Sequence, residues 1–151
     1  MRMVLQRVSR ASVTVGDASV GSIADGLVIL VGIAPADTDH EIDRAVDKVS
    51  NLRIFPDEAG LMNRSIVDTG GSVLLVSQFT LLADVGKGRR PSFADAADPE
   101  TAEPLIDRFA TMLRELGIPT ETGVFGASMA VDLVNEGPVT IIIDVKDGHV
   151  S

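Results

Sequence analysis

The chain contains no cysteine, tryptophan or tyrosine. The absence of cysteine excludes disulfides, a thiolate nucleophile and cysteine metal ligands. Because phenylalanine is the only aromatic residue, the core must be built mainly from Val, Ile and Leu, within a hydrophobic content of 45%. A chain of 151 residues with this content predicts one domain, spanning residues 1–151.

Histidine is also scarce, since the chain has only His40 and His149. We expect His40 in the first turn of a solvent-exposed helix and His149 close to the last residue. Neither place suits a general base or a metal ligand, which disfavours a Ser-His-Asp triad and a histidine metal site. The glycines of GKGRRPS lack the spacing of a Walker loop. We therefore expect no metal and no cofactor.

No apolar run is long enough to cross a membrane. LVILVGIA, at residues 27–34, is far shorter than the roughly 20 residues that a spanning helix needs. The N-terminal MRMVLQRVSRASV has charged residues at short intervals and lacks the apolar segment of a signal peptide. These absences predict a soluble, cytoplasmic protein.

Acidic residues outnumber basic ones by 22 to 13, and the net charge is −9. A broad electrostatic grip on nucleic acid is excluded by this balance. One basic cluster remains in GKGRRPSF, residues 86–93, which contains Lys87, Arg89 and Arg90. If the chain binds RNA, we expect this segment to make the contact.

Hydrophobic periodicity divides the chain into strands and helices. Helices are predicted at about 39–52, where Thr38 and Glu41 match a capping box, and at about 101–116, with Thr101 as a candidate cap. The predicted strands cover residues 1–8, 11–15, 18–23, 27–33, 52–55, 72–82, 120–124, 129–135 and 139–145.

Two helices cannot cover both faces of so many strands, so some strands must cover others. We expect an α/β fold that has either three layers, helix on sheet on sheet, or a barrel-like sheet with two helices. The run at 27–33 is apolar throughout, which predicts a strand covered on both faces. The final KDGHVS is expected to be frayed.

Two segments carry unusual residues for their place. NEGPVT, residues 135–140, puts Gly137-Pro138 between two strand-like runs, either as a hairpin turn or as backbone held out for a purpose. VSQFTLL, residues 76–82, interrupts an apolar strand with Ser77, Gln78 and Thr80. That pattern fits an edge strand with one wet face, or a polar cluster that offers hydroxyl and amide groups to a ligand.

Two shorter features are open in the same way. Phe125 and Met129, in FGASM, are either core residues around a glycine turn or part of a binding site. Arg7 shares a strand face with Met3 and Leu5. An arginine at a strand end usually reaches solvent, but this one can instead donate to backbone carbonyls.

Together, SQFTL (77–81), KGRRPSF (87–93), FGASM (125–129) and NEGPVT (135–140) resemble the bacterial and eukaryotic D-aminoacyl-tRNA deacylase family, and the resemblance runs nearly from end to end. In that family the Gly-Pro peptide is cis and reaches into the active site of the partner subunit. The resemblance implies a homodimer that hydrolyses D-aminoacyl-tRNA and glycyl-tRNA, while Gly137 and Pro138 exclude L-aminoacyl esters by crowding.

The resemblance also implies residue roles. Ser77, Gln78, Phe79 and Thr80 would line the site of ester hydrolysis, with backbone amides of this stretch facing the oxyanion. Thr80 matches a family threonine that is either a nucleophile or an orienting group. Because no base is in evidence, the orienting role is preferred, and the 2′-hydroxyl of the substrate ribose would help to activate water.

The remaining roles implied by the resemblance lie around this site. Arg7 would brace the Gly-Pro segment, and Phe125 and Met129 would shape the pocket wall. Lys87, Arg89 and Arg90 would bind the acceptor stem of the tRNA.

Three places depart from the family pattern: Ser128 and Glu136 stand where many relatives have Asp, and Val85-Gly86 replaces a more polar pair. These changes bear on RNA contacts rather than on the reaction. The rival hypothesis is a non-catalytic module that holds an adenosine or an RNA 3′ end. The two differ in turnover, because a binder protects the ester whereas an enzyme releases the amino acid.

Overall fold

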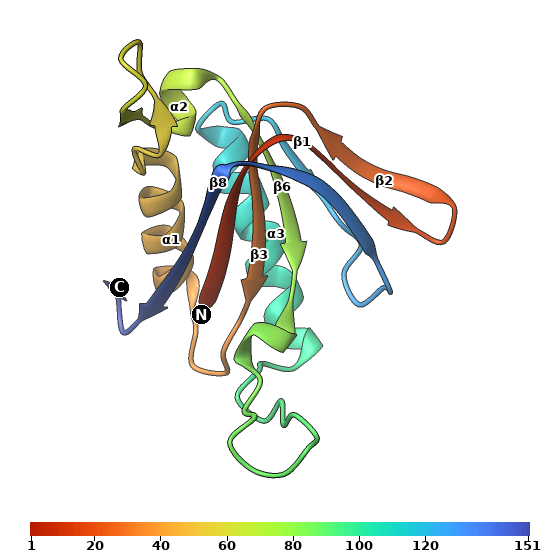
Figure 1. Cartoon of the computed structure of the whole chain (residues 1–151). Helices are drawn as coiled ribbons and strands as arrows, with labels where there is room; N and C mark the ends of the chain where they lie inside the picture. The colour runs from red at the N-terminus through yellow and green to blue at the C-terminus, as the bar shows by residue number, and fades with distance from the viewer.

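The computed structural model describes residues 1–151 (Figure 1). The elements in chain order are β1 (Arg2–Val15), β2 (Ala18–Ile23), β3 (Gly26–Gly32), α1 (Asp39–Asn51), β4 (Phe55–Pro56), β5 (Met62–Arg64), α2 (Ile66–Thr69), β6 (Ser72–Ser77), the 3-10 helix η1 (Phe79–Leu82), α3 (Pro99–Glu115), β7 (Thr120–Thr122), β8 (Ala130–Lys146) and β9 (His149–Val150).

Seven strands form the main sheet, in the order β7-β6-β3-β1-β8-β9, with β2 paired to the far half of β1. β1 is antiparallel to β2, β3 and β8, whereas β6 is parallel to both β3 and β7. The segments predicted as strands 1–8 and 11–15 are one strand, because β8 pairs with β1 from Arg2 to Thr14. A long strand with three partners therefore organises the sheet.

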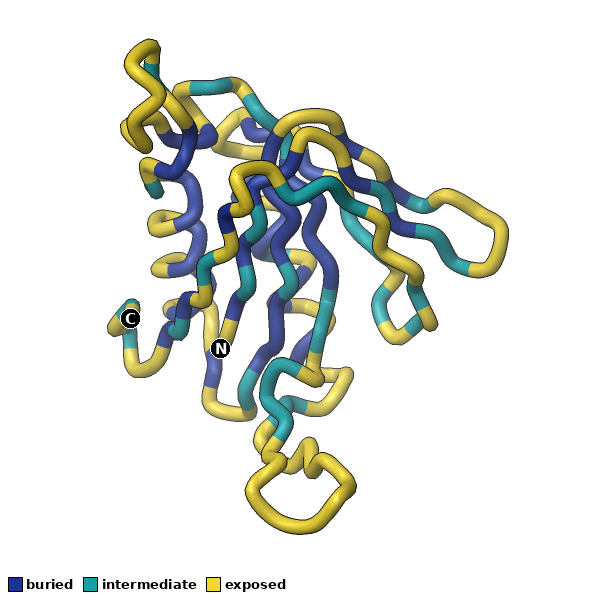
Figure 2. The backbone as a smooth tube through the Cα atoms, in the orientation of Figure 1, coloured by how far each residue is buried: buried dark blue, intermediate teal, exposed yellow.

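Helices α1 and α3 cover one face of the sheet, where Leu5, Ile29 and Leu75 pack in one core with the fully buried Phe109. On the other face, Val28 and Leu74 form a second core with Val13 of β1 and Ile23 of β2. The sheet curls so that β2 lies over β6 and β7. Figure 2 shows the buried band along the sheet centre. The predicted α/β fold, with helices on a sheet that partly covers itself, is confirmed.

The two long helices begin at side-chain caps. The predicted capping box at Thr38 and Glu41 is confirmed at the start of α1. The predicted cap Thr101 is wrong: Asp98 caps α3, and its carboxylate accepts from the amide of Thr101 at 2.8 Å. Pro99 then occupies the first helical position, where its missing amide costs nothing. No helix of the chain is long and apolar enough to span a membrane.

Gly137-Pro138 is not the tip of a hairpin. The runs predicted as strands 129–135 and 139–145 are one strand, β8, which stays paired with β1 on both sides of this dipeptide. Glu136 to Val139 bulge out of the ladder, and the Gly137-Pro138 peptide is cis. The tail is not frayed either, because β9 turns back to pair with the end of β8.

The strand predicted at 72–82 ends at Ser77, and residues 79–82 form η1 instead. Gln78 and Thr80, which strand alternation over 72–82 would place on one face, therefore do not share a strand face. β6 lies between β3 and β7, but β7 pairs only with Val73–Leu75, so Ser77 has a strand partner, Val31, on the β3 side alone. The polar residues of this segment stand where a central strand ends and the chain turns over the sheet.

Candidate active site

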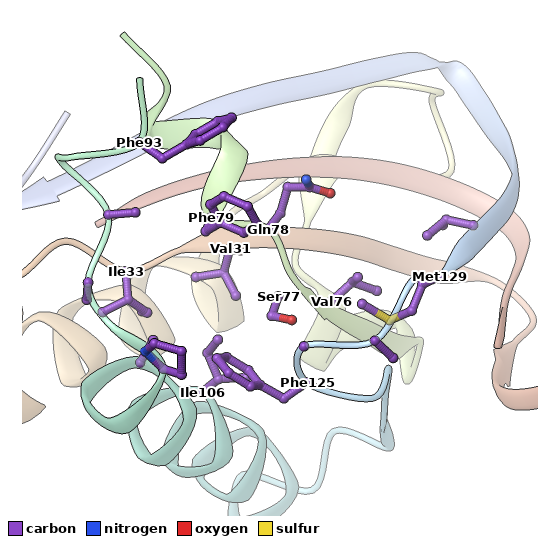
Figure 3. A pocket seen from close by; sticks show the side chains of 17 residues that line it. Val31, Ile33, Val76, Ser77, Gln78, Phe79, Phe93, Ile106, Phe125 and Met129 are labelled. Atoms are coloured by element: carbon purple, nitrogen blue, oxygen red, sulfur yellow. The ribbon is translucent and has the colours of Figure 1, made fainter. Parts of the chain in front are cut away.

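A pocket of about 480 Å³ opens beside the end of β6. Its walls come from the ends of β3 and β6, the start of α3 and the turn before β8 (Figure 3). The lining residues are Val31, Ile33, Val76, Ser77, Gln78, Phe79, Phe93, Ala96, Ala97, Pro99, Ala102, Ile106, Phe125, Gly126, Ala127, Met129 and Val131. Phe79 and Phe93 stand at one end of this view and Met129 at the other, with Ser77 between them.

The turn from Gln78 to Leu82 is held tightly against β3. The amide of Gln78 donates to the carbonyl of Val31 at 2.7 Å, which extends the sheet pairing by one bond. Gly32 lets the turn approach, since a Cβ at this position would lie 2.9 Å from the carbonyl oxygen of Gln78. The Gln78 side-chain amide donates to the hydroxyl of Thr80. Backbone contacts thus hold the turn, and a side-chain hydrogen bond orders its polar groups.

An aromatic pair joins this turn to the basic loop. The rings of Phe79 and Phe93 meet edge to face, with centroids 5.0 Å apart and planes at 72°. The loop is closed by two backbone hydrogen bonds between Asp84 and Ser92, at 2.8 and 2.9 Å. The loop between them is exposed throughout (Figure 2). The loop base is therefore fixed next to the pocket.

The pocket is lined entirely by uncharged side chains, among which Ser77 and Gln78 supply the hydrogen-bonding groups. Asp98 immediately precedes the lining residue Pro99. Its pKa is lowered, chiefly by the hydrogen bond from the backbone amide of Thr101, so it remains a carboxylate that caps α3. No three His, Cys, Asp or Glu side chains lie close enough to hold a metal ion. Such a pocket suits an apolar or aromatic group and acts through position and hydrogen bonding.

The structure gathers most of the predicted site residues. Ser77, Gln78, Phe79, Phe125 and Met129 all line the pocket. Thr80 is not among the lining residues, but it is hydrogen-bonded to one of them. The sequence interpretation missed Val31, Ile33, Ile106, Phe93 and the small alanines. Only Phe93 carried a signal, because it stands in the basic motif.

Lys87, Arg89 and Arg90 are exposed on the loop beyond the aromatic pair, outside the pocket lining. The structure therefore brings these predicted tRNA-binding residues near one end of the pocket without placing them in it.

The other predicted residues form a second group under the bulge of β8. Arg7 is only 8% exposed, and its Nη1 donates to the carbonyl of Ile54 at 2.6 Å. Its Nε lies 3.6 Å from a carboxylate oxygen of Glu136. Gly137 has φ of +118°, and a Cβ there would lie 3.0 Å from Nη2 of Arg7. Gly137 and Pro138 are exposed and do not line the pocket of their own chain.

Known proteins match almost the whole chain in sequence. A family model described as D-Tyr-tRNA(Tyr) deacylase matches residues 4–144. A protein named D-aminoacyl-tRNA deacylase from Roseiflexus sp. (strain RS-1) is 60% identical over 144 residues, which cover 95% of this chain and 93% of the relative. One of the same name from Thermus aquaticus is 54% identical over 147 residues, covering 97% of each chain.

Solved structures share the fold. The structure titled c-Myc DNA Unwinding Element Binding Protein has a TM-score of 0.90 and 41% identity, with 97% of this chain and 99% of that chain covered. A probable eukaryotic D-amino acid tRNA deacylase has a TM-score of 0.83 at 21% identity, covering 95% and 98%, and shows likeness of fold alone.

Proposed function

The chain belongs to the D-Tyr-tRNA(Tyr) deacylase family, and on that premise we propose that it is a hydrolase that cleaves the ester of D-aminoacyl-tRNA, in the cytoplasm where aminoacyl-tRNA is made. The family predicted from SQFTL and NEGPVT is thereby confirmed. The observation that carries the proposal is the 60% identity to a D-aminoacyl-tRNA deacylase over 95% of this chain.

The uncharged pocket fits this reaction. An aminoacyl ester is already activated, so holding it in place and stabilising the developing oxyanion can supply much of the rate. The first amides of a helical turn have no acceptor inside it, so those of Phe79 and Thr80 at the start of η1 are the candidate oxyanion donors. Thr80 then orients Gln78, and the ribose 2′-hydroxyl of the substrate helps to activate water.

The filter for handedness belongs to the bulge of β8, and we place it in the partner's pocket. Gly137 and Pro138 are exposed and lie outside the pocket of their own chain, which supports a role in the pocket of another copy. Apolar side chains on the same strand are also uncovered, with Ile142 63% and Val131 37% exposed. In a twofold dimer, each pocket would receive the tip of the partner's bulge, which is the Gly137-Pro138 dipeptide of the partner subunit. Glycine has no side chain to clash, so glycyl-tRNA would also be hydrolysed.

The acceptor stem is held by the basic loop. Lys87, Arg89 and Arg90 extend from a loop whose base is closed by the Asp84–Ser92 pair and whose end carries Phe93 against Phe79. Phosphates approaching this loop would follow a 3′ end that enters the pocket. A local patch of this kind allows RNA binding by a chain with a net charge of −9.

Turnover of matched substrates tests the activity. Purified protein is offered one tRNA charged with the D- or the L-form of the same amino acid, and free amino acid is measured against time. We expect release from the D-ester and from glycyl-tRNA but not from the L-ester. Protection of the D-ester without release would instead show the binding module that is the rival hypothesis.

Subunit mixing tests the borrowed tip. We expect Pro138→Ala to admit the L-ester with little loss of stability, because this residue is exposed. Ala127→Trp fills a pocket by placing a bulky side chain on its lining. In mixed dimers of these two chains, the open pocket receives an unaltered tip from its partner, so rejection of the L-ester returns. Continued cleavage of the L-ester by the mixed dimer, purified away from both homodimers, would place the filter within one chain.

Salt dependence tests the loop. The combined change of Lys87, Arg89 and Arg90 to alanine is expected to raise KM for D-aminoacyl-tRNA and to flatten its dependence on salt, with an unchanged rate on D-aminoacyl-adenosine, which has no stem. Arg44→Ala, a surface arginine on α1, is the charge control. An equal rise in KM for both substrates would refute the phosphate role.

A further inference from the structure

The base of the β8 bulge contains a side chain that stands in for missing backbone pairing. Between the pairs Gln6–Thr140 and Val8–Asn135, β1 has one residue, Arg7, whereas β8 has the four residues 136–139. An interruption of this size removes amide donors from the ladder and leaves carbonyls that need other partners.

The side-chain amide of Asn135 donates to two of these carbonyls. Its Nδ2 donates to the carbonyl of Arg7 at 3.0 Å and to the carbonyl of Val139 at 2.9 Å. Its Oδ1 accepts from the hydroxyl of Thr140 at 3.4 Å, which fixes the direction of the amide. The same hydroxyl accepts from Nε2 of Gln6 at 3.2 Å. One amide group thus ties the two ends of the bulge to each other and to β1.

We propose that Asn135 is a positioning residue for the chiral filter, because its amide fixes where Gly137 and Pro138 stand in the partner's pocket. The inference rests on the filter role proposed for these two residues. Arg7 supports the segment from beneath and Asn135 spans its base, so the tip is held on two sides. A backbone filter rejects the L-ester only while it cannot yield, which makes the rigidity of its base part of the specificity.

The chemistry of this position requires an amide. Asparagine offers two N–H donors, whereas an ionised carboxylate of the same shape offers none and turns lone pairs toward two carbonyl oxygens. Alanine removes the donor to both carbonyls, and because the site is half-buried, water does not fully take its place. Either change frees the bulge without touching the pocket.

The test compares Asn135→Asp and Asn135→Ala with the wild type, through kcat and KM for tRNA charged with D- and L-forms of one amino acid. We expect the D-over-L ratio to fall about tenfold, which is roughly the worth of two net hydrogen bonds. The fall comes from faster cleavage of the L-ester, while kcat for the D-ester changes by less than about twofold. Asn51→Ala is the control, since its Nδ2 is also a hydrogen-bond donor, to the carbonyl and carboxylate of Asp47 and to the hydroxyl of Ser50, all on α1.

A milder variant keeps the inference testable if the others do not fold. Thr140→Val removes the long bond that orients the Asn135 amide, together with the bond that this hydroxyl accepts from Gln6, and leaves both donor bonds of Asn135 in place. A two- to threefold fall in the D-over-L ratio is expected. An unchanged ratio in folded Asn135 variants, or in Thr140→Val when those do not fold, overturns the proposal. An equal loss of D- and L-cleavage also overturns it, because that is the effect of a purely structural role. If Gly137 and Pro138 are not the filter, the result is different. The wild type then cleaves the L-ester as well as the D-ester, or Pro138→Ala still rejects the L-ester.

Discussion

Gly32→Ala tests whether the turn after β6 is a positioned catalytic element. The added Cβ would lie 2.9 Å from the carbonyl oxygen of Gln78, whereas ordinary contacts begin at 3.4 Å, so the turn has to move by the difference, 0.5 Å. Overpacking of this kind costs about 1–3 kcal/mol of stability. Because a displacement of ~1 Å can cost about 10²-fold in rate, half of it should lower kcat on D-aminoacyl-tRNA about tenfold.

Single-turnover hydrolysis and thermal unfolding measure the two effects separately. Gly21→Ala is the matched control, because its Cβ would meet another backbone carbonyl, that of Thr122, at 3.0 Å, away from the turn. We expect it to lower the Tm by a similar amount and to leave kcat unchanged. If Gly32→Ala lowers only the Tm, or if Gly21→Ala loses as much activity, the turn is not a catalytic element.

Three further predictions concern the core, the start of α1 and the pocket. Phe109→Ala should destabilise the fold by about 3–5 kcal/mol in urea unfolding, since this side chain is fully buried; a loss below about 1 kcal/mol would contradict this packing. The pKa of Glu41 is held below its ordinary 4.5, chiefly by the hydroxyl of Thr38. The stability that this carboxylate gives to the fold is therefore fully present above pH 4.5 and is lost as pH falls through the folded-state pKa. Glu41→Gln should therefore flatten the fall of Tm below about pH 4.5, and an unchanged slope would count against the assignment. Because the pocket lining is uncharged, the ratio of enzymatic to spontaneous ester hydrolysis should stay level between about pH 6 and pH 8, and a bell-shaped ratio would reveal a titrating group.

Local signals sufficed for the elements that local contacts determine. α1 was predicted almost to the residue, because its capping box and its apolar stripe both lie within the helix itself. The core strand β3 followed from an unbroken apolar run that is buried on both faces. The alternation of Met3, Leu5 and Arg7 was likewise realised, and all three are buried.

The errors arose where distant contacts override local ones. Gly137-Pro138 has the composition of a turn, but pairing with β1 on both sides keeps β8 continuous. Phe79, Leu81 and Leu82 continue the apolar pattern of β6, yet the chain leaves the strand after Ser77 and packs on Gly32. Most of the pocket wall escaped notice for a similar reason, since Ala96, Ala97 and Ala127 carry no chemical signal until the fold assembles them.

The pairing of the first long strand with the last one sets the order of folding during synthesis. Arg2 and Asp144 are joined by two hydrogen bonds although they lie 142 positions apart in the sequence. Until β8 has left the ribosome, one side of β1 lacks its neighbour, and an unpaired strand edge is prone to wrong association. The residues of the bulge emerge with β8, so a nascent chain cannot present this bulge before the sheet that carries it can close.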